Sequence, residues 1–256
     1  MKTTSPYKMA PLAPFFMLAA FILSGCGDPE SSKESSIASM FRANLQRTGV
    51  FPSGGPSTLN ELVWKFQTGD SVLSSPTILN GTMYIGSSDG HLYAVDIANG
   101  QEQWSFKTDE EVHSSPAISG DTVYFGSGDG QFYSVDAATG QERWSYKTGD
   151  SVWSSPAISG GTVYFGSMDG QLYAVDTATG QEQWSFKTDE GVSSSPAISG
   201  GTVYFGSMDG QLYAVDTATG QEQWSFKTDE GVSSSPAISG GTVYFGSMDG
   251  QLYAVD

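Results

Sequence analysis

Short runs that mix apolar and polar residues recur along residues 61–256, and each run has the length of a β-strand. In one copy the runs are SSPAI, TVYFGS, QLYAVD and QEQWSFKT. β-Branched and aromatic residues dominate them, as expected of strands that bury part of their surface. No stretch of this region repeats its apolar residues at helical spacing. The pattern therefore predicts an all-β region.

Turn-forming residues separate the runs. Ser-Gly-Gly or Ser-Gly-Asp joins the first run to the second, and Asp-Gly, a strong hairpin signal, joins the second to the third. Asp-x-x-Thr-Gly joins the third to the fourth, where the Asp side chain can accept backbone N–H groups and Gly can adopt a positive φ. Each unit is thus predicted to form four antiparallel strands.

The four-strand unit repeats every 40 residues. Two stretches, Ser154–Asp216 and Ser194–Asp256, are identical. Four-stranded antiparallel units repeated in series are typical of the blades of a β-propeller. We predict an all-β propeller of about five four-stranded antiparallel blades built from 40-residue repeats. The tryptophan of each repeat is expected to pack in the core between blades: Trp64, Trp104, Trp144, Trp184 and Trp224.

The two ends of the repeat region differ in phase. Glu61–Thr68 has the pattern of a fourth strand, and the region ends after a third-strand run, Gln251–Asp256. Pairing these two segments would complete the last blade and remove two open sheet edges. An open arc is also tolerable, because the units of a repeat protein contact only their neighbours. The prediction is a propeller closed through this N-terminal strand or an open arc.

The segment around each tryptophan resembles a known family motif. AVDIANGQEQW at 94–104 and AVDTATGQEQW at 174–184 resemble the tryptophan-docking motif A-x-D-x-x-T-G-x-x-x-W of the PQQ-like, or quinoprotein-type, propeller repeat. The second copy has Ser134 for Ala, and the first has Asn99 for Thr. The resemblance covers about residues 61–256 and implies a propeller, although such propellers usually have seven or eight blades. Residues 40–60 form a lead-in, whose start (MFRANLQRTG) resembles the segment that opens such domains in envelope proteins.

The N-terminus has the pattern of a secretory signal over residues 1–25. Lys2 and Lys8 precede the apolar run PFFMLAAFIL at 14–23, which is too short for a transmembrane helix. The run leads into Leu23-Ser24-Gly25-Cys26, which resembles the lipobox of bacterial lipoproteins. That resemblance implies cleavage before Cys26 and attachment of diacylglycerol, often with a third acyl chain such as palmitate, which anchors firmly. An ordinary signal peptide with an incidental cysteine is the alternative.

Residues 26–39 are polar and are expected to form a flexible tether after the lipidated cysteine. By resemblance to the sorting rule of Gram-negative lipoproteins, an Asp directly after the cysteine signals inner-membrane retention. Gly27 stands there instead. The protein is therefore expected to be secreted across the inner membrane and anchored by its lipid. If the cell is Gram-negative, the expected location is the outer membrane.

Composition removes several classes of function. The formal net charge is −17 with 11 Lys and Arg residues, so a nucleic-acid partner is not expected. One cysteine and two histidines exclude a disulfide framework and a cysteine-rich zinc site.

One repeat position varies while its surroundings stay constant. Leu73, His113, Trp153, Ser193 and Ser233 occupy it, just before the strand expected to line the central channel. Trp153 is the best single anchor for a partner, since Trp is enriched at interface hot spots. The alternative for the variable position is sequence drift between copies. The alternative for the acids of the same face is turn chemistry and solubility. The candidate partner surface comprises Trp153, His113, Leu73, Asp109, Glu110 and Asp169.

The resemblance leaves three function classes open. Quinoprotein dehydrogenases, which use PQQ and calcium, need adjacent cysteines, a catalytic Asp, and Glu and Asn ligands that cannot be placed here, so no catalytic residue, metal or cofactor is expected. A glycan-binding propeller is a second possibility. A non-catalytic scaffold, similar to the BamB-like envelope lipoproteins, fits best. Its expected partners are the membrane, through the Cys26 lipid, and an unidentified envelope protein.

Overall fold

The computed structural model describes residues 44, 55, 58 and 61–256. The predicted signal peptide (1–25), the tether (26–39) with Cys26, and nearly all of the lead-in (40–60) lie outside the described residues. No helix in the described part is long and apolar enough to cross a membrane.

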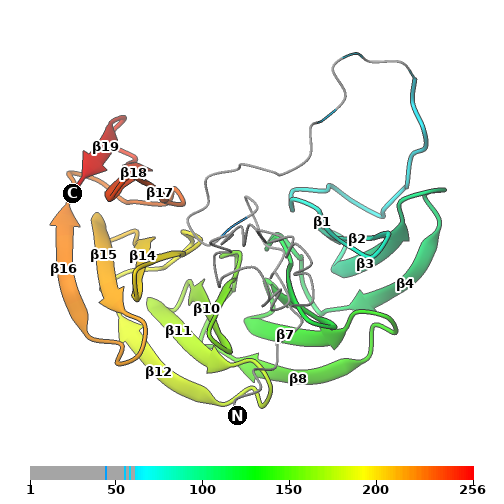
Figure 1. Cartoon of the computed structure of the whole chain (residues 1–256), viewed down its shortest axis with the longest axis horizontal. Helices are drawn as coiled ribbons and strands as arrows, with labels where there is room; N and C mark the ends of the chain where they lie inside the picture. The colour runs from blue at the N-terminus through cyan, green and yellow to red at the C-terminus, as the bar shows by residue number, and fades with distance from the viewer. Residues whose placement is uncertain (1–43, 45–54, 56–57, 59–60) are drawn as a thin grey trace, which may run out of the picture. The chain divides into compact units, whose positions relative to one another are not determined.

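Residues 61–256 form five antiparallel sheets, which we number as blades 1 to 5 (Figure 1). Blade 1 contains β1 (Thr77–Leu79), β2 (Thr82–Ser87), β3 (His91–Asp96) and β4 (Glu102–Lys107). Blade 2 contains β5 (Ala117–Ser119), β6 (Thr122–Gly126), β7 (Gln131–Asp136) and β8 (Glu142–Lys147). Blade 3 contains β9 (Ala157–Ser159), β10 (Thr162–Ser167), β11 (Gln171–Asp176) and β12 (Glu182–Lys187). Blade 4 contains β13 (Ala197–Ser199), β14 (Thr202–Gly206), β15 (Gln211–Asp216) and β16 (Glu222–Lys227), and blade 5 contains β17 (Ala237–Ser239), β18 (Thr242–Gly246) and β19 (Leu252–Val255).

Every blade is a simple meander in which neighbours in sequence are neighbours in the sheet. The predicted all-β fold with four-stranded antiparallel repeats is confirmed, with three strands in blade 5. In blade 3, Tyr164 lies opposite Ala174, and Ala174 lies opposite Trp184. A register shift follows Ala174 and recurs at the same place in the other four-stranded blades. The repeated sequence thus gives one repeated sheet geometry.

The blades follow one another around an arc within residues 61–256. The first strands β1, β5, β9, β13 and β17 lie in contact in that order on the inner side, and the fourth strands lie on the outer side (Figure 1). β1 and β17 do not contact each other. Of the two arrangements expected from the sequence, the structure shows the open arc.

Glu61–Thr68 does not pair with β19. It contains no assigned strand, and β19 pairs only with β18 among the described residues. Instead, the Trp64 indole N–H donates to the Ile97 carbonyl at 2.8 Å. The Phe66 ring packs edge-on against Tyr93 in blade 1, with centroids 5.2 Å apart. The segment therefore lies on blade 1 as the outer strand of a preceding blade would, at the opposite end of the arc from β19.

Apolar side chains fill each junction between blades. Between blades 1 and 2, Leu92 and Ala94 pack against Ile118, Val123 and Phe125, and all five are buried. Equivalent clusters fill the junctions between blades 2 and 3 and between blades 3 and 4. Full burial of one such side chain is worth about 1.5–3 kcal/mol, so each blade is stabilised mainly by its neighbours.

Each junction also carries a tryptophan hydrogen bond on its outer side. The indole N–H of Trp144 donates to the Thr177 carbonyl at 2.9 Å, and that of Trp184 donates to the Thr217 carbonyl at 3.0 Å. Gly180, at φ 71°, leaves room for the Trp144 ring, because a Cβ there would lie 2.8 Å from a ring carbon. These tryptophans are half-buried on the outer strands rather than enclosed in the core.

A serine ladder links the inner ends of the blades. The Ser114 hydroxyl donates to the Ser154 carbonyl at 3.0 Å, and Ser154 repeats this bond to Ser194 at 3.0 Å. Beside it, the Ser115 N–H donates to the Ser155 hydroxyl at 2.9 Å. In blades 2 to 4 the two serines of the SSP motif therefore satisfy polar groups across the junction to the next blade, where an unpaired buried group would be costly.

We predict that Trp184→Ala lowers the free energy of unfolding by about 3 kcal/mol, because it removes a packed ring and its bond to Thr217. Trp224→Ala is the matched control. Trp224 packs on Tyr204, but no bond of its indole to another blade is found among the described residues. Urea unfolding should show a clearly smaller loss for Trp224→Ala. Equal losses would mean that docking across the junction adds nothing.

Candidate interaction surface

The loops between blades and the Asp-Gly hairpins lie on one face of the arc, which we call the loop face. The Ser88 N–H donates to the Ser71 carbonyl at 2.8 Å, and the Gly128 N–H donates to the Glu111 carbonyl at 2.8 Å. The same bond recurs in the remaining blades. Each loop is thus tied to the hairpin of the blade that follows it.

The variable repeat position lies on this surface, next to the first strand of each blade. Leu73 is 67% exposed and Trp153 is 40% exposed. His113, between them in blade order, is half-buried, and its Nε2 lies 2.9 Å from the Ser88 hydroxyl in a hydrogen bond. Ser193 and Ser233 hold the position in blades 4 and 5. The apolar side chains at this position are therefore confined to blades 1 and 3.

Asp109 and Glu110 lie close to this position. Together with Ser88 and Lys107 they line a shallow pocket of about 200 Å³ where blades 1 and 2 meet. Since Ser88 also bonds to His113, the structure brings His113, Asp109 and Glu110 to one place. Both acids are exposed, so they contribute negative charge to the rim rather than to a closed site.

Asp169 has a different role from the one considered for it. Its carboxylate accepts bonds from the Tyr173 hydroxyl at 2.7 Å, the Gly149 N–H at 2.7 Å and the Gln171 N–H at 3.0 Å. All three bonds hold the hairpin and the adjoining loop in place. For Asp169, the turn-chemistry alternative accounts for these three bonds, and its part in a partner surface stays a prediction.

The same arrangement in blade 1 perturbs two pKa values. Burial, followed by the hydrogen bond to the Asp89 carboxylate at 2.8 Å, raises the pKa of Tyr93 to about 12. Burial alone would raise the pKa of Asp89, but the bonds from Tyr93, Gly69 and Ser87 outweigh it and lower the pKa. At neutral pH the Tyr93 hydroxyl therefore stays protonated and donates to an ionised Asp89 carboxylate, and this bond is suited to holding the turn.

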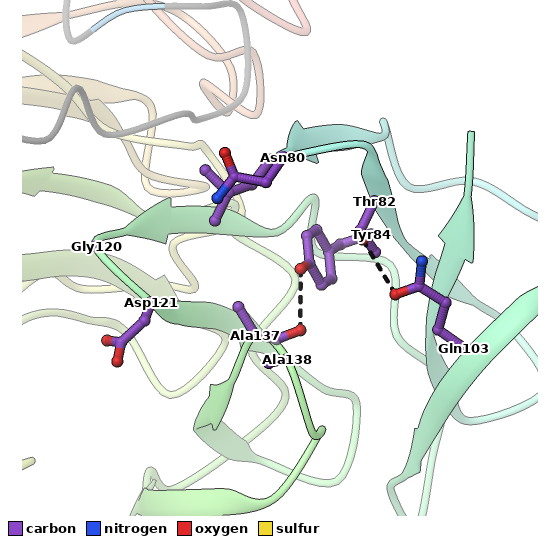
Figure 2. Close-up of a pocket in the computed structure, with 9 residues that line it drawn as sticks. Asn80, Thr82, Tyr84, Gln103, Gly120, Asp121, Ala137 and Ala138 are labelled. Carbon is purple, nitrogen blue, oxygen red and sulfur yellow. Dashed lines mark hydrogen bonds between the residues drawn. The ribbon is translucent and has the colours of Figure 1, made fainter. Parts of the chain in front are cut away.

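A second pocket opens between blades 1 and 2 (Figure 2), and none of the candidate residues lines it. It has a volume of about 290 Å³, and its lining includes Asn80, Tyr84, Gln103 and Ala137. Tyr84 is buried, and its hydroxyl donates to the Ala137 carbonyl at 3.0 Å (Figure 2). A sugar would need an open aromatic face for stacking, and Tyr84 does not present one. The pocket thus gives the glycan-binding alternative little support.

One charged cluster was not anticipated from the sequence. Arg143 in β8 stands where the other complete blades have Gln. Its guanidinium donates to Asp136 at 2.6 Å and to Asp121 at 2.8 Å. The bond from Arg143 is the largest of several that lower the pKa of Asp136 to about 2. In the sequence, only the replacement of Gln by Arg at position 143 indicated this cluster. Its partners Asp121 and Asp136 belong to separate turns, so the sequence did not identify them.

The described residues do not fit a quinone and calcium site. Among them, no group of three or more His, Cys, Asp or Glu side chains is placed to hold a metal ion. The hairpin Asp residues that recur in every blade bond to a tyrosine and to backbone N–H groups.

The chain belongs to the family described as outer membrane protein assembly factor BamB, which matches residues 57–151 and 147–256. No curated protein matches the chain. This family assignment confirms the PQQ-like repeat inferred from the tryptophan motif.

Solved structures share the fold. BamB from Moraxella catarrhalis is 24% identical, with a TM-score of 0.68, over 76% of this chain and 64% of that chain. The computationally designed Ika8 protein is 23% identical, with a TM-score of 0.63, over 70% of this chain and 56% of that chain. Quinohemoprotein alcohol dehydrogenase from Comamonas testosteroni is 17% identical, with a TM-score of 0.68, over 77% of this chain and 43% of that chain. The chain thus spans less than two thirds of each, and these likenesses show the fold alone.

We predict that Arg143→Gln destabilises the protein at neutral pH and not near pH 2. The depressed pKa of Asp136 means that its ionised form favours the folded state. That contribution is complete above the ordinary carboxyl pKa of about 4 and is lost as the pH falls toward 2. Urea unfolding at pH 7, 4, 3 and 2 measures the difference between variant and wild type. Lys147→Gln, on the same strand, controls for the loss of one positive charge. A difference that stays constant down to pH 2 contradicts the assignment.

Proposed function

We propose that this chain is a lipid-anchored envelope protein that acts as a non-catalytic interaction scaffold, with a BamB-type role in outer-membrane assembly. Membership of the BamB family supports the scaffold class. The observation that carries the proposal is the exposure of Trp153 on the loop face, where the neighbouring repeats have Ser or His. Trp is among the residues most often found at the centre of protein interfaces.

The surroundings of Trp153 suit a protein partner. Leu73 adds a second exposed apolar side chain at the same repeat position two blades away. Asp109 and Glu110 add negative charge on the blade between them. An apolar anchor with a charged rim is the usual anatomy of a specific interface. The partner we propose presents an apolar side chain to Trp153 and basic residues to the acidic rim, which would also speed its association.

Anchoring forms the second part of the proposal. The lipobox-like sequence supports a lipid on Cys26, and the polar stretch 26–39 would then serve as a tether between the membrane and the arc. With Gly27 after the cysteine, we propose the outer membrane of a Gram-negative cell as the location.

The proposal includes no enzymatic activity, quinone or calcium. Catalysis needs groups with distinct roles at one place, whereas the hairpin Asp residues of this chain recur in equivalent turns. Addition of the quinone and calcium to the purified protein should give no dye-linked oxidation of alcohols. Any such turnover would overturn the non-catalytic part of the proposal.

We predict that Cys26→Ser releases the protein from membranes or leaves the precursor unprocessed. The thiol is the only one in the chain and the only atom to which a thioether lipid can be attached. Membrane fractionation and the mass of the N-terminal peptide measure the effect. Ser24→Ala, which keeps a small residue before the cysteine, should remain processed and membrane-bound. A Cys26→Ser variant that stays processed and membrane-bound would refute lipid anchoring.

We predict that Trp153→Ala reduces recovery of the envelope partner at least tenfold in crosslinking pull-downs from membranes, since loss of an interface tryptophan typically costs more than about 1.4 kcal/mol. The side chain is exposed, so the stability of the fold should hardly change. Ser193→Ala, the same position in blade 4, is the matched control and should leave recovery unchanged. Equal recovery with Trp153→Ala would remove the loop face as the binding surface.

A further inference from the structure

The pocket of Figure 2 lies at the opposite ends of the strands from the loop face. Its lining includes Asn80 from the β1–β2 turn, Asp121 from the β5–β6 turn, and Ala137 and Ala138 from the loop after β7. In a four-stranded meander these turns lie at the ends away from the Asp-Gly hairpins. We call it the turn pocket, and it is separate from Trp153 and the loop face.

Residues that depart from the repeat meet in the turn pocket. Leu79 and Asn80 stand where blades 2 to 5 have Ser and Gly. Asp121 stands where every other blade has Gly, and Ala137 stands where blades 3 and 4 have Thr. The next two junctions carry Ser, Gly, Gly and Thr at the same four positions. Three separate segments of the sequence therefore change at one place, and only the packing of blade 1 on blade 2 brings them together.

The change at Ala137 opens part of this space. In blade 3 the Thr177 hydroxyl donates to the Gly161 carbonyl at 2.9 Å, and the same bond recurs in blade 4. Ala137 has no hydroxyl, but its N–H still donates to the Asp121 carbonyl at 2.9 Å, so the backbone arrangement is kept. Ala137 is buried and lines the pocket. The pocket thus gains the space that a threonine side chain fills in blades 3 and 4.

Asn80 places an amide group at the mouth of the turn pocket. It is the one non-glycine with a positive φ, 49°, among the residues that the structure describes, whereas the four equivalent glycines have φ between 58° and 61°. This left-handed conformation is unfavourable for most side chains and least so for Asn and Asp. No hydrogen bond of the Asn80 side chain is found within the described part of the chain, so the turn does not need the amide. The amide is therefore free to bind a ligand.

A second amide, that of Gln103, lines the pocket across from Asn80 (Figure 2). Its Oε1 accepts from the Thr82 hydroxyl at 3.1 Å, which fixes the side chain. For its Nε2 no hydrogen bond is found among the described residues. An amide N–H donor suits a peptide carbonyl. The turn pocket thus offers two such donors on opposite sides.

The remaining lining gives the pocket an apolar wall and a negative rim. Leu79 packs on the apolar core of the junction, and Ala137 adds to the same wall. At the rim, the Asp121 side chain is 79% exposed, although it accepts from Arg143 at 2.8 Å. Arg143 also bonds to Asp136, so the three groups carry one net negative charge. A cation of a ligand can therefore approach the open side of Asp121.

We propose that the turn pocket binds an extended peptide segment of a partner protein. A small apolar side chain of the peptide lies against Leu79 and Ala137. The amide groups of Asn80 and Gln103 donate to main-chain carbonyls of the peptide. A Lys or Arg next to the apolar residue lies beside Asp121.

The size and openness of the pocket favour a peptide over a free small molecule. Its volume of about 290 Å³ is below the usual range of small-molecule sites and suits one or two side chains. Asn80, Gln103, Asp121 and Ala138 are all exposed, so a bound group keeps one side in solvent. A side chain carried by a longer segment meets this condition, because the segment continues over the surface. This second contact goes beyond the proposed role of the loop face.

Peptide titration tests the proposal in the full chain carrying Cys26→Ser, which removes the proposed lipid. The probe is the capped peptide acetyl-Gly-Val-Lys-Gly-amide, and amide NMR shifts of the isotope-labelled protein are the measurement. We expect saturable shifts with a millimolar dissociation constant. Replacing Val by Ser in the peptide should weaken binding roughly tenfold, because apolar burial is lost. Replacing Lys by Glu should weaken it about threefold at low salt, as expected of an exposed charge pair.

Two variants restore residues of the repeat and are therefore expected to fold. Ala137→Thr refills the space and should weaken binding of the Val-Lys peptide roughly tenfold. Asp121→Gly should remove the preference for Lys over Glu. Trp153→Ala is the control on the loop face and should bind the peptide like wild type, so this test is independent of the proposed loop-face partner.

The proposal is overturned if the Val-Lys peptide gives no saturable shifts. It is equally overturned if Ala137→Thr binds the peptide like wild type, or if Trp153→Ala weakens binding as much as Ala137→Thr does. A preference for Lys that survives Asp121→Gly contradicts the role of that carboxylate. Binding of acetyl-valine-amide as tight as that of the peptide would show a small-molecule site instead and would also overturn the proposal.

Discussion

The fold depends on one contact, the junction in which a tryptophan from one blade docks on the loop of the next. A single blade is a small sheet with two apolar faces, and neither face is covered by the blade itself. The indole bond to the loop carbonyl, the glycine that admits the ring, and the apolar cluster beneath them join blade to blade. The serine ladder fixes the inner side of the same junction. Stability is therefore passed from neighbour to neighbour, as in other repeat proteins.

Constancy between repeats separates structural residues from candidates for function. Asp169 and its counterparts look like an acidic surface in the sequence, yet their carboxylates are engaged in holding turns. Trp153 stands where the sequence departs from the repeat, and it is exposed. A residue that departs from the repeat does not always have a function. Ser134 replaces the usual Ala, and its buried hydroxyl has no hydrogen-bond partner among the described residues. Exposure and geometry, rather than variation alone, identify the loop face as the surface to test.

The sequence by itself determined the strands, their order and the blade architecture, because turns and strand patterns are local and repeat five times. The hairpin Asp-Gly and the Asp-x-x-Thr-Gly loop each act within a few residues, so their outcome did not depend on the rest of the chain. The position of Trp64, in contrast, depended on contacts between segments distant in sequence. Its segment has a fourth-strand pattern, but the pattern fits two places, the open edge of β19 and the outer side of blade 1. Only the hydrogen bond from Trp64 to the Ile97 carbonyl and the packing of Phe66 on Tyr93 decided between them. The half-burial of the tryptophans and the pairing of Arg143 with Asp121 and Asp136 depend in the same way on contacts between segments distant in sequence.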